Sequence, residues 1–363
     1  MKAPIKQLAV WSGFLISLGC LYLVFRSVPV DELLEALGRI RWGLVFPAFV
    51  MMYLSIYYRG LRWWWLFGSR TEIVSNRVLL EGIMVGYAIN NTLPSGRLGE
   101  FARTLYISKG RDLTFSRAFG TMVVDRLFDS VVILLLVGLT SLWILPIDPE
   151  VQVDFGGFEF SASVLNPLFA NVAIGSLGVV VCVLLLLVPA VAHFAELVIH
   201  RLPFLPGSLK EKIWGFAEGI FHGVGGIKDR VCLAWASTHS LLIWGINAGA
   251  AFMLAWAIPG LELSVFQSVG LMAIVTVCSV VPAAPGAWGL YEAGMLVGFQ
   301  VLDIHDDMAV ALAYGVTMHL IFYLPTTVIG LGLLMKSAIR ISTASRLGDE
   351  MTRTEGESHT PGS

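Results

Sequence analysis

Six runs of apolar residues in this chain approach or exceed the length that crosses a membrane as an α-helix. A spanning helix needs about 18 or more apolar residues, because each residue adds only ~1.5 Å. The runs cover about residues 7–25, 43–58, 118–145, 166–189, 232–258 and 308–335. With a mean hydropathy of +0.77 and 14% charged residues, the chain cannot cover itself with a hydrated surface. The sequence therefore predicts an all-α polytopic membrane protein with six spanning helices.

Two further apolar segments, about 79–107 and 266–302, are interrupted by proline and glycine. The residues at these breaks are Asn91, Pro94, Gly96 and Gly99 in the first segment and Pro285, Gly286 and Gly289 in the second. Each arm has about 15 residues, or ~22 Å as a helix, which is shorter than the ~30 Å hydrocarbon core. Broken backbone at membrane depth must line a polar cavity or lie inside protein. We therefore expect two re-entrant helical hairpins.

The distribution of basic residues predicts how these segments are arranged, because Lys and Arg gather in cytoplasmic loops. If both broken segments turn back, most of the 24 Lys and Arg residues fall on one side. The loop at 146–165, on the other side, has four acidic and no basic residues. This pattern predicts a multi-pass protein of the cytoplasmic (inner) membrane with both termini on the cytoplasmic side. Repeat A, 1–146, is then followed by repeat B, 166–336, turned upside down as an inverted repeat.

These features predict one transmembrane domain, 1–341, with two peripheral amphipathic helices at about 31–41 and 207–228. After about Ser342 the chain becomes polar and loses its aromatic residues. The segment 342–363 is therefore predicted to be a disordered cytoplasmic tail.

Ionisable residues inside the membrane segments are the candidate site, because a charge in lipid is costly. They are Arg97, Glu100, Arg103, Asp125, Arg126, Asp129 and Glu292. The three residues from Arg97 to Arg103 share a helix face, and a helix beginning near Gly96 would add a positive dipole end. Such a cradle suits a phosphate. The alternative is that Arg103 extends to the inner interface while Arg97 and Glu100 form a structural ion pair.

The second charged set, Asp125 to Asp129, predicts a buried network. Asp125 and Asp129 are four residues apart and share a helix face, while Arg126 can pair with Asp129. Three charges within five residues at the start of a spanning helix favour a network over a single interfacial anchor.

Glu292 follows the second break and has no basic residue within twenty positions on either side. It is expected either to pair with Arg97, Arg103 or Arg126 from the other repeat or to act as a proton-coupling acid. The sequence leaves both open. His319 is interpreted as a hydrogen-bonded packing residue.

Arg59, Arg62 and the three tryptophans at 63–65 are typical of an aromatic and basic belt at the inner membrane interface. We therefore expect their side chains near the lipid headgroups rather than in the site.

Neither a cofactor nor a metal site is predicted. The sequence contains no Walker loop, dinucleotide-binding glycine pattern, G-x-S-x-G or H-E-x-x-H motif. The four cysteines lie in apolar runs without metal or disulfide spacing. The net charge of -2 argues against nucleic acid as a partner. Membrane lipids with an anionic or phosphate-bearing headgroup are the expected partners.

Four motifs follow one another in a characteristic order. They are Arg59-x-x-Arg62-Trp63, Asn91-x-Leu93-Pro94-x-Gly96-Arg97-x-Gly99-Glu100-x-x-Arg103, Asp125-Arg126-Leu127-x-Asp129 and Pro285-Gly286-x-x-Gly289-x-x-Glu292. Over about residues 7–336, the chain resembles the flippase-like membrane domain of the lysylphosphatidylglycerol synthase family, although Asp125 stands where the family usually has Glu. The resemblance implies a stand-alone version of the flipping half. It does not imply the aminoacyl transfer to phosphatidylglycerol that other members carry out with a second, soluble domain.

The function predicted is therefore lipid translocation by a transporter, not catalysis. Arg97, Arg103 and Arg126 would hold the headgroup while the lipid tails stay in the bilayer. One alternative is an intramembrane enzyme on a lipid substrate, with Glu100, Asp129 or Glu292 as acid or base. The other is a non-transporting partner of a lipid or envelope biosynthesis enzyme. Self-association into a homo-oligomer is compatible with each of these.

Overall fold

The computed structural model describes the backbone of residues 3–68, 73–93, 98–140, 152–161, 163, 165–203, 205–279 and 284–357. It describes the side chains of the same residues except 3–11, 226 and 338–357. The helices are α1 (Ala3–Ser27), α2 (Val30–Gly38), α3 (Trp42–Trp65), α4 (Asn76–Thr92), α5 (Leu98–Ser108), α6 (Phe115–Leu139), α7 (Leu165–Leu186), α8 (Pro189–Arg201), α9 (Gly207–Val224), α10 (Arg230–Ala255), α11 (Val265–Cys278), α12 (Leu290–Val301) and α13 (Met308–Glu357). An antiparallel pair of short strands, β1 (Gln152–Asp154) and β2 (Glu159–Ser161), lies between α6 and α7.

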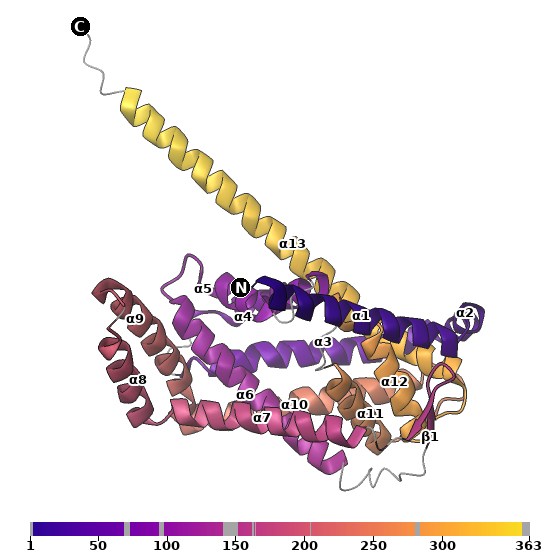
Figure 1. Cartoon of the computed structure of the whole chain (residues 1–363). Helices are drawn as coiled ribbons and strands as arrows, with labels where there is room; N and C mark the ends of the chain where they lie inside the picture. The colour runs from indigo at the N-terminus through magenta and orange to yellow at the C-terminus, as the bar shows by residue number, and fades with distance from the viewer. Residues whose placement is uncertain are drawn as a thin grey trace.

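Four described helices are long and apolar enough to cross a membrane. They are α3, α7, α10 and the first part of α13, Met308–Ser337. A fifth span is formed if Ser12–Ser27 of α1 and α2, which meet at a 76° bend, count as one. α6 has 25 residues but contains several charged side chains. The chain is an all-α polytopic membrane protein, as predicted (Figure 1).

The first broken segment folds as two helices, α4 and α5, which pack against each other as hairpin 1. A glycine on each helix permits this contact, because Gly99 lies against the backbone of Gly86. The amide of Gly99 also donates to Oδ1 of Asn90 at 2.8 Å, which ties the start of α5 to the end of α4. Of the residues at the predicted break, Pro94, Gly96 and Arg97 lie outside the described residues.

Replacing Gly99 by alanine is expected to destabilise the protein by about 1–3 kcal/mol, because the new methyl group would overlap the Gly86 carbonyl oxygen. Gly138→Ala on α6 is the matched control, since a Cβ there meets nothing within 4 Å. It should be neutral or stabilising by about 0.5–1 kcal/mol, because alanine stabilises the interior of a helix relative to glycine. Denaturation in detergent micelles measures both. Equal stability of the two variants would contradict this close contact.

The second broken segment forms hairpin 2, in which α11 and α12 pack together and the 3-10 turn Pro285–Ala287 lies at the tip. Gly286 and Gly289 have φ angles of +71° and +86°. This left-handed backbone is accessible to glycine without strain and turns the chain into the start of α12. Gly289 also approaches α1, since a Cβ there would lie 2.5 Å from the Ser17 carbonyl oxygen.

The two hairpins open toward opposite ends of the apolar part of α13, Met308–Ser337, and meet near the middle of that part. At one end, Arg77 of α4, Lys109 after α5 and Lys336 of α13 line one surface pocket. At the other, Gln267 at the start of α11 donates to the Leu302 carbonyl after α12, just before α13 begins. At the tips, Asn91 donates to Thr327 at 2.8 Å, and Gly286 contacts Tyr323.

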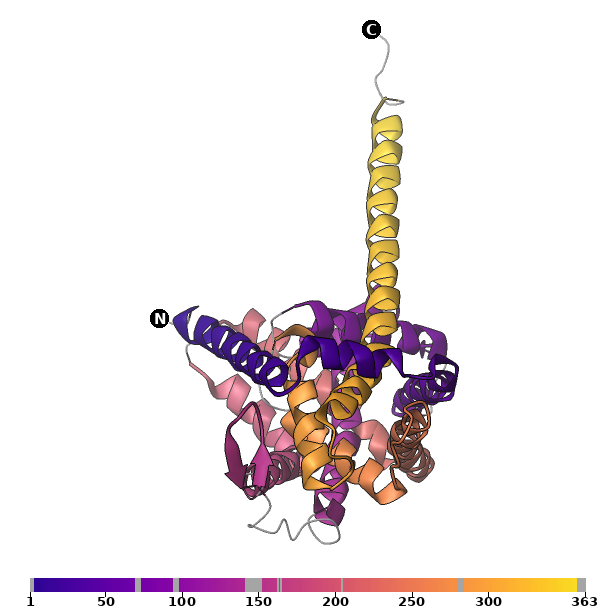
Figure 2. The same ribbon diagram turned by 90° about the vertical axis from the view of Figure 1, so that its right-hand side faces the viewer.

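Three features differ from what the sequence suggests. The chain forms an additional helix, α8, and the β1–β2 hairpin inside the predicted acidic loop. By contrast, α9 forms most of the amphipathic helix predicted at 207–228, and it packs on α6. The tail is predicted to be disordered from Ser342, but α13 continues as a helix to Glu357 and projects from the bundle (Figure 2). A polar composition indicates that a segment does not pack into a hydrophobic core. It does not prevent an existing helix from continuing into that segment.

Candidate functional site

Seven charged side chains from three helices come together inside the bundle. We call them the charge cluster: Arg59 and Arg62 of α3, Glu100 and Arg103 of α5, and Asp125, Arg126 and Asp129 of α6. Helical spacing explains the arrangement, because residues three or four positions apart lie on one face. α3, α5 and α6 each turn one such face toward the same point.

Asp125 is the centre of the charge cluster and is almost completely buried. Its Oδ1 accepts from Nε of Arg62 at 2.8 Å, and Nη2 of the same guanidinium lies 2.7 Å away. Its Oδ2 lies 3.2 Å from Nη2 of Arg103 and 2.9 Å from Nη2 of Arg126. One carboxylate therefore holds three arginines, so its removal would leave three cations facing each other.

Arg62 is fully buried, at 0% exposure, and joins the two aspartates of α6. Its Nη1 lies 2.8 Å from Oδ1 of Asp129 and donates to the Ser240 hydroxyl of α10 at 3.1 Å. The predicted position of Arg62 in an interfacial belt is therefore wrong. The arginine faces the carboxylates of α6 because a fully buried guanidinium is costly unless it is paired with opposite charge.

Arg103 and Trp63 connect the cluster to the surrounding core. Nη2 of Arg103 lies 2.7 Å from Oε2 of Glu100, and its guanidinium stacks 4.7 Å from the Trp63 ring centroid. Trp63 is itself fully buried and donates from Nε1 to Thr121 at 3.0 Å. Both residues are therefore interior residues, and Arg103 does not extend to the interface.

The charge cluster has more positive than negative charge. Four arginines face three carboxylates, which leaves one excess positive charge among these described residues. The Nε atoms of Arg103 and Arg126 are also buried without a hydrogen-bond partner. Buried charges and donors are normally satisfied. An anionic group with several acceptor oxygens would satisfy both, which favours a phosphate or carboxylate ligand.

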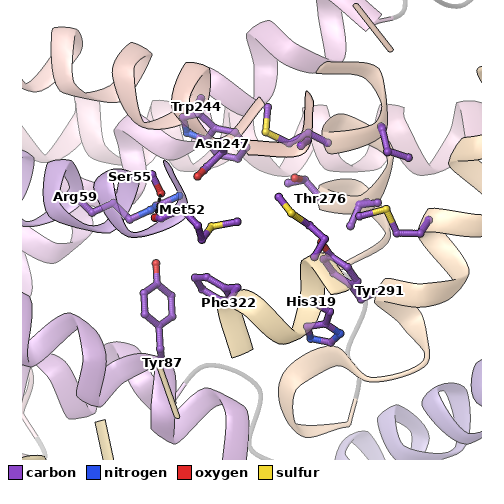
Figure 3. Close-up of a pocket in the computed structure, with 16 residues that line it drawn as sticks. Met52, Ser55, Arg59, Tyr87, Trp244, Asn247, Thr276, Tyr291, His319 and Phe322 are labelled. Atoms are coloured by element: carbon purple, nitrogen blue, oxygen red, sulfur yellow. Dashed lines mark hydrogen bonds between the residues drawn. The ribbon is translucent and has the colours of Figure 1, made fainter. Parts of the chain in front are cut away.

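Two cavities adjoin the cluster. A small one of about 30 Å³ is bounded by Glu100, Arg103, Asp125 and Arg126, among others. A larger chamber of about 260 Å³ lies between α3, α4, α10, α11, α12 and α13. Arg59 and Tyr87 line both, so the cluster and the chamber share a wall. Figure 3 shows Arg59 and Tyr87 on one side of the chamber and His319 and Tyr291 on the other.

The chamber is mainly apolar with a few polar groups that point inward. Four methionines and Phe322 form much of its wall. Trp244 and Asn247 of α10 also line it, and the Trp244 Nε1 and Asn247 Oδ1 atoms are buried without a partner. An apolar space with a few convergent polar groups is typical of a small-molecule site.

Glu292 pairs with His319, a histidine on the far wall of the chamber, instead of with an arginine. Its Oε1 lies 2.6 Å from Nδ1 of His319, and its Oε2 accepts from the Gly289 amide at 2.7 Å. The expectation that Arg103 or Arg126 reaches Glu292 is wrong, because both pair within the charge cluster. His319 lies closer because α13 passes directly beside the tip of hairpin 2.

The structure thus divides the predicted site residues into two groups. Glu100, Arg103, Asp125, Arg126 and Asp129 meet in the charge cluster, whereas Glu292 lies across the chamber. Arg97 lies outside the described residues. Arg59, Arg62 and His319 were not predicted as site residues. The i, i+3 spacing of the two arginines, complementary to Asp125 and Asp129, was a usable signal. Among the described residues, no group of three or more metal-ligating side chains comes together.

Comparison with known proteins gives one family and several distant relatives. The family model of the lysylphosphatidylglycerol synthase transmembrane region matches residues 10–330. The glycosyltransferase AglD of Haloferax volcanii is 24% identical over 97% of this chain, which spans only 58% of that relative. UPF0104 membrane proteins of Pyrococcus horikoshii and Methanothermobacter thermautotrophicus are each 23% identical, over 87% and 82% of this chain and 93% and 86% of their own.

No solved structure matches the chain closely enough to compare. The family match covers the charge cluster, the chamber and both hairpins. The chain therefore belongs to the family of the lysylphosphatidylglycerol synthase transmembrane region.

Proposed function

We propose that this protein is a translocase that moves a phosphate-bearing lipid, or a lipid-linked headgroup, between membrane leaflets. The observation that carries the proposal is the charge cluster, with its excess positive charge and two unpaired Nε donors beside a chamber inside the bundle. A free soluble anion would not need an apolar chamber next to its binding groups. An amphiphile needs both the charged groups and the apolar space.

The arrangement of the hairpins supports alternating access to this site. Hairpins 1 and 2 open toward opposite ends of the apolar part of α13, Met308–Ser337, and their tips contact its middle. We propose that they are equivalent elements of an inverted repeat, re-entering from opposite sides as predicted from charge. On this proposal the termini are cytoplasmic and the protein resides in the inner membrane. Rocking of one repeat against the other would expose the chamber to each leaflet in turn.

Reconstitution into liposomes tests the proposal. Headgroup-labelled phosphatidylglycerol and a labelled polyprenyl phosphate report movement when a membrane-impermeant reagent quenches the outer leaflet, and a labelled uncharged diacylglycerol is the comparison lipid. Protein-dependent movement of an anionic lipid is expected. Movement of no anionic lipid would refute the proposal.

Arg126→Ala is expected to reduce this movement at least tenfold, because a charge-assisted hydrogen bond contributes roughly 1.5–3 kcal/mol. Arg126 is the most exposed arginine of the cluster, at 34%, and lines the small cavity. Arg201→Ala, an exposed arginine at the end of α8, is the control and should behave as wild type. Equal rates for Arg126→Ala and wild type would exclude a headgroup site at the cluster.

An intramembrane enzyme is the second candidate, because His319 lines the chamber and is hydrogen-bonded to Glu292, as in an acid–base pair. The carboxylates of the charge cluster fit this role less well, since each is engaged by arginine. Mass spectrometry of lipids incubated with the purified protein distinguishes the two functions. A chemically altered lipid would favour the enzyme, and unaltered lipids that change leaflet favour the translocase.

A further inference from the structure

We propose that Glu292 and His319 form a proton-binding site at the chamber wall, and that loss of this proton weakens the attachment of hairpin 2 to α13. The site itself follows from hydrogen-bond geometry. Its use in transport rests on the proposed function, because only a translocase would couple the proton to lipid movement.

The hydrogen bonds around His319 require a proton on Nε2. This atom lies 2.9 Å from the Gly286 carbonyl oxygen. A carbonyl oxygen can only accept, so Nε2 must carry the hydrogen that is donated. In a neutral imidazole, the other ring nitrogen, Nδ1, then has a lone pair and no hydrogen.

The contact between Nδ1 and Glu292 requires a second proton. Nδ1 lies 2.6 Å from Oε1 of Glu292, which is a hydrogen-bond distance. A carboxylate and an unprotonated Nδ1 would direct lone pairs at each other across it. One proton must therefore lie between them, either on the histidine or on the glutamic acid. In both cases the pair has no net charge, which suits its almost complete burial.

The pair holds the tip of hairpin 2 together. Oε2 of Glu292 accepts from the Gly289 amide, so one continuous chain of hydrogen bonds joins Gly289, Glu292, His319 and Gly286. The imidazole is also enclosed by the Trp288 and Tyr291 rings, with centroids 4.4 Å away in each case. Without the shared proton, the hydrogen bond between Glu292 of α12 and His319 of α13, at the centre of this series, is lost. The tip of hairpin 2 is then held to α13 only by the Gly286 hydrogen bond and the ring contacts.

Proton access is available through the chamber. His319 and Tyr291 both line it, and Figure 3 shows their side chains at its edge, opposite Arg59. The described ion pairs give Glu292 no partner other than His319. The other titratable or charged groups around the pair and the chamber are Tyr291, Tyr314 and Tyr323, Cys278 on α11, Cys20 on α1, and Tyr87 and Arg59 across the chamber.

The Glu292→Gln variant tests the role of the proton, because it removes the proton but keeps the hydrogen bonds. The glutamine amide group can donate to an unprotonated Nδ1, while its oxygen still accepts from Gly289. All three hydrogen bonds then persist without the additional proton, and every surrounding titratable group is unchanged. The variant should therefore keep hairpin 2 closed at any pH, whereas the wild type should open as pH rises and the proton is lost.

Hydrogen exchange of the peptide at 284–295 in lipid nanodiscs, corrected for intrinsic exchange, measures this opening across a series of pH values. We expect wild-type protection to fall with rising pH, by up to about tenfold per pH unit for one linked proton. Glu292→Gln should show no such slope. Glu262→Gln, an exposed glutamate before α11, should keep the wild-type slope. His319→Phe, which preserves ring volume but not the hydrogen bonds, should be unprotected at every pH.

A wild type without a slope, or equal slopes in wild type and Glu292→Gln, would overturn the proposal. Protection of α10 in the same samples shows whether each variant is folded, and the wild-type slope is informative without any variant. The translocase is judged separately. If no lipid moves but the slope is lost in Glu292→Gln, the translocase fails and the proton site stands. If lipid moves and the slopes are equal, the proton site fails alone.

Discussion

Asp125→Asn is expected to lower the free energy of unfolding by about 3–5 kcal/mol, as for other buried charges that lose one partner. Asp125 contacts Arg62, Arg103 and Arg126 within 3.2 Å and is 4% exposed at its side chain. An amide can accept a hydrogen bond from one arginine but cannot neutralise any. The cluster would then contain four arginines and two carboxylates in a site from which water is largely excluded.

Unfolding in mixed detergent micelles, followed by circular dichroism, measures this loss. Asp306→Asn, an exposed aspartate before α13, is the control and should stay within about 0.5 kcal/mol of wild type. Adding Arg62→Met to Asp125→Asn should recover part of the stability, because it removes one of the unpaired cations. The two substitutions are then non-additive. Equal stability of Asp125→Asn and Asp306→Asn would mean that the cluster is not a buried network.

Much of the fold could be predicted from local patterns. Apolar length predicted six spanning helices, and four described helices are long and apolar enough to cross a membrane. The Pro and Gly breaks indicated both hairpins, because a break depends on a short stretch of chain. The β1–β2 pair and α8 could not be predicted in this way. The strands are three residues each, and α8 has no buried face that would leave a strong periodic pattern.

The candidate site was predictable only where its partners lie close in sequence. Arg126 and Asp129, three residues apart, pair at 3.2 Å as expected from helical spacing. Arg62 lies 63 residues from Asp125, and its neighbouring tryptophans resemble an interfacial belt, so the local pattern pointed to the wrong environment. Glu292 and His319 are on different helices, and which histidine reaches a glutamate depends on packing that sequence spacing does not record.

The charge cluster therefore has two parts with different expected roles. Asp125 and Arg62 are fully engaged and stabilise the bundle. Arg59 is engaged least: its closest described carboxylate contact is 3.6 Å, to Asp129, and no hydrogen bond accompanies it. Its side chain is 17% exposed and lines both the small cavity and the chamber. It is the arginine best placed to transfer a bound anion between these two spaces.

Arg59→Gln is accordingly expected to slow translocation of an anionic lipid about 10- to 100-fold while costing at most about 1 kcal/mol of stability. Asp125→Asn should show the opposite result, with a larger effect on the free energy of unfolding than on the translocation rate. Initial rates in the liposome assay, together with unfolding of the same preparations, separate the two effects. Arg59→Lys should recover part of the rate, since charge is kept but the bidentate geometry is lost. If Arg59→Gln were as unstable as Asp125→Asn, Arg59 would be a structural member of the network, and the headgroup would have to be held by Arg103 and Arg126 alone.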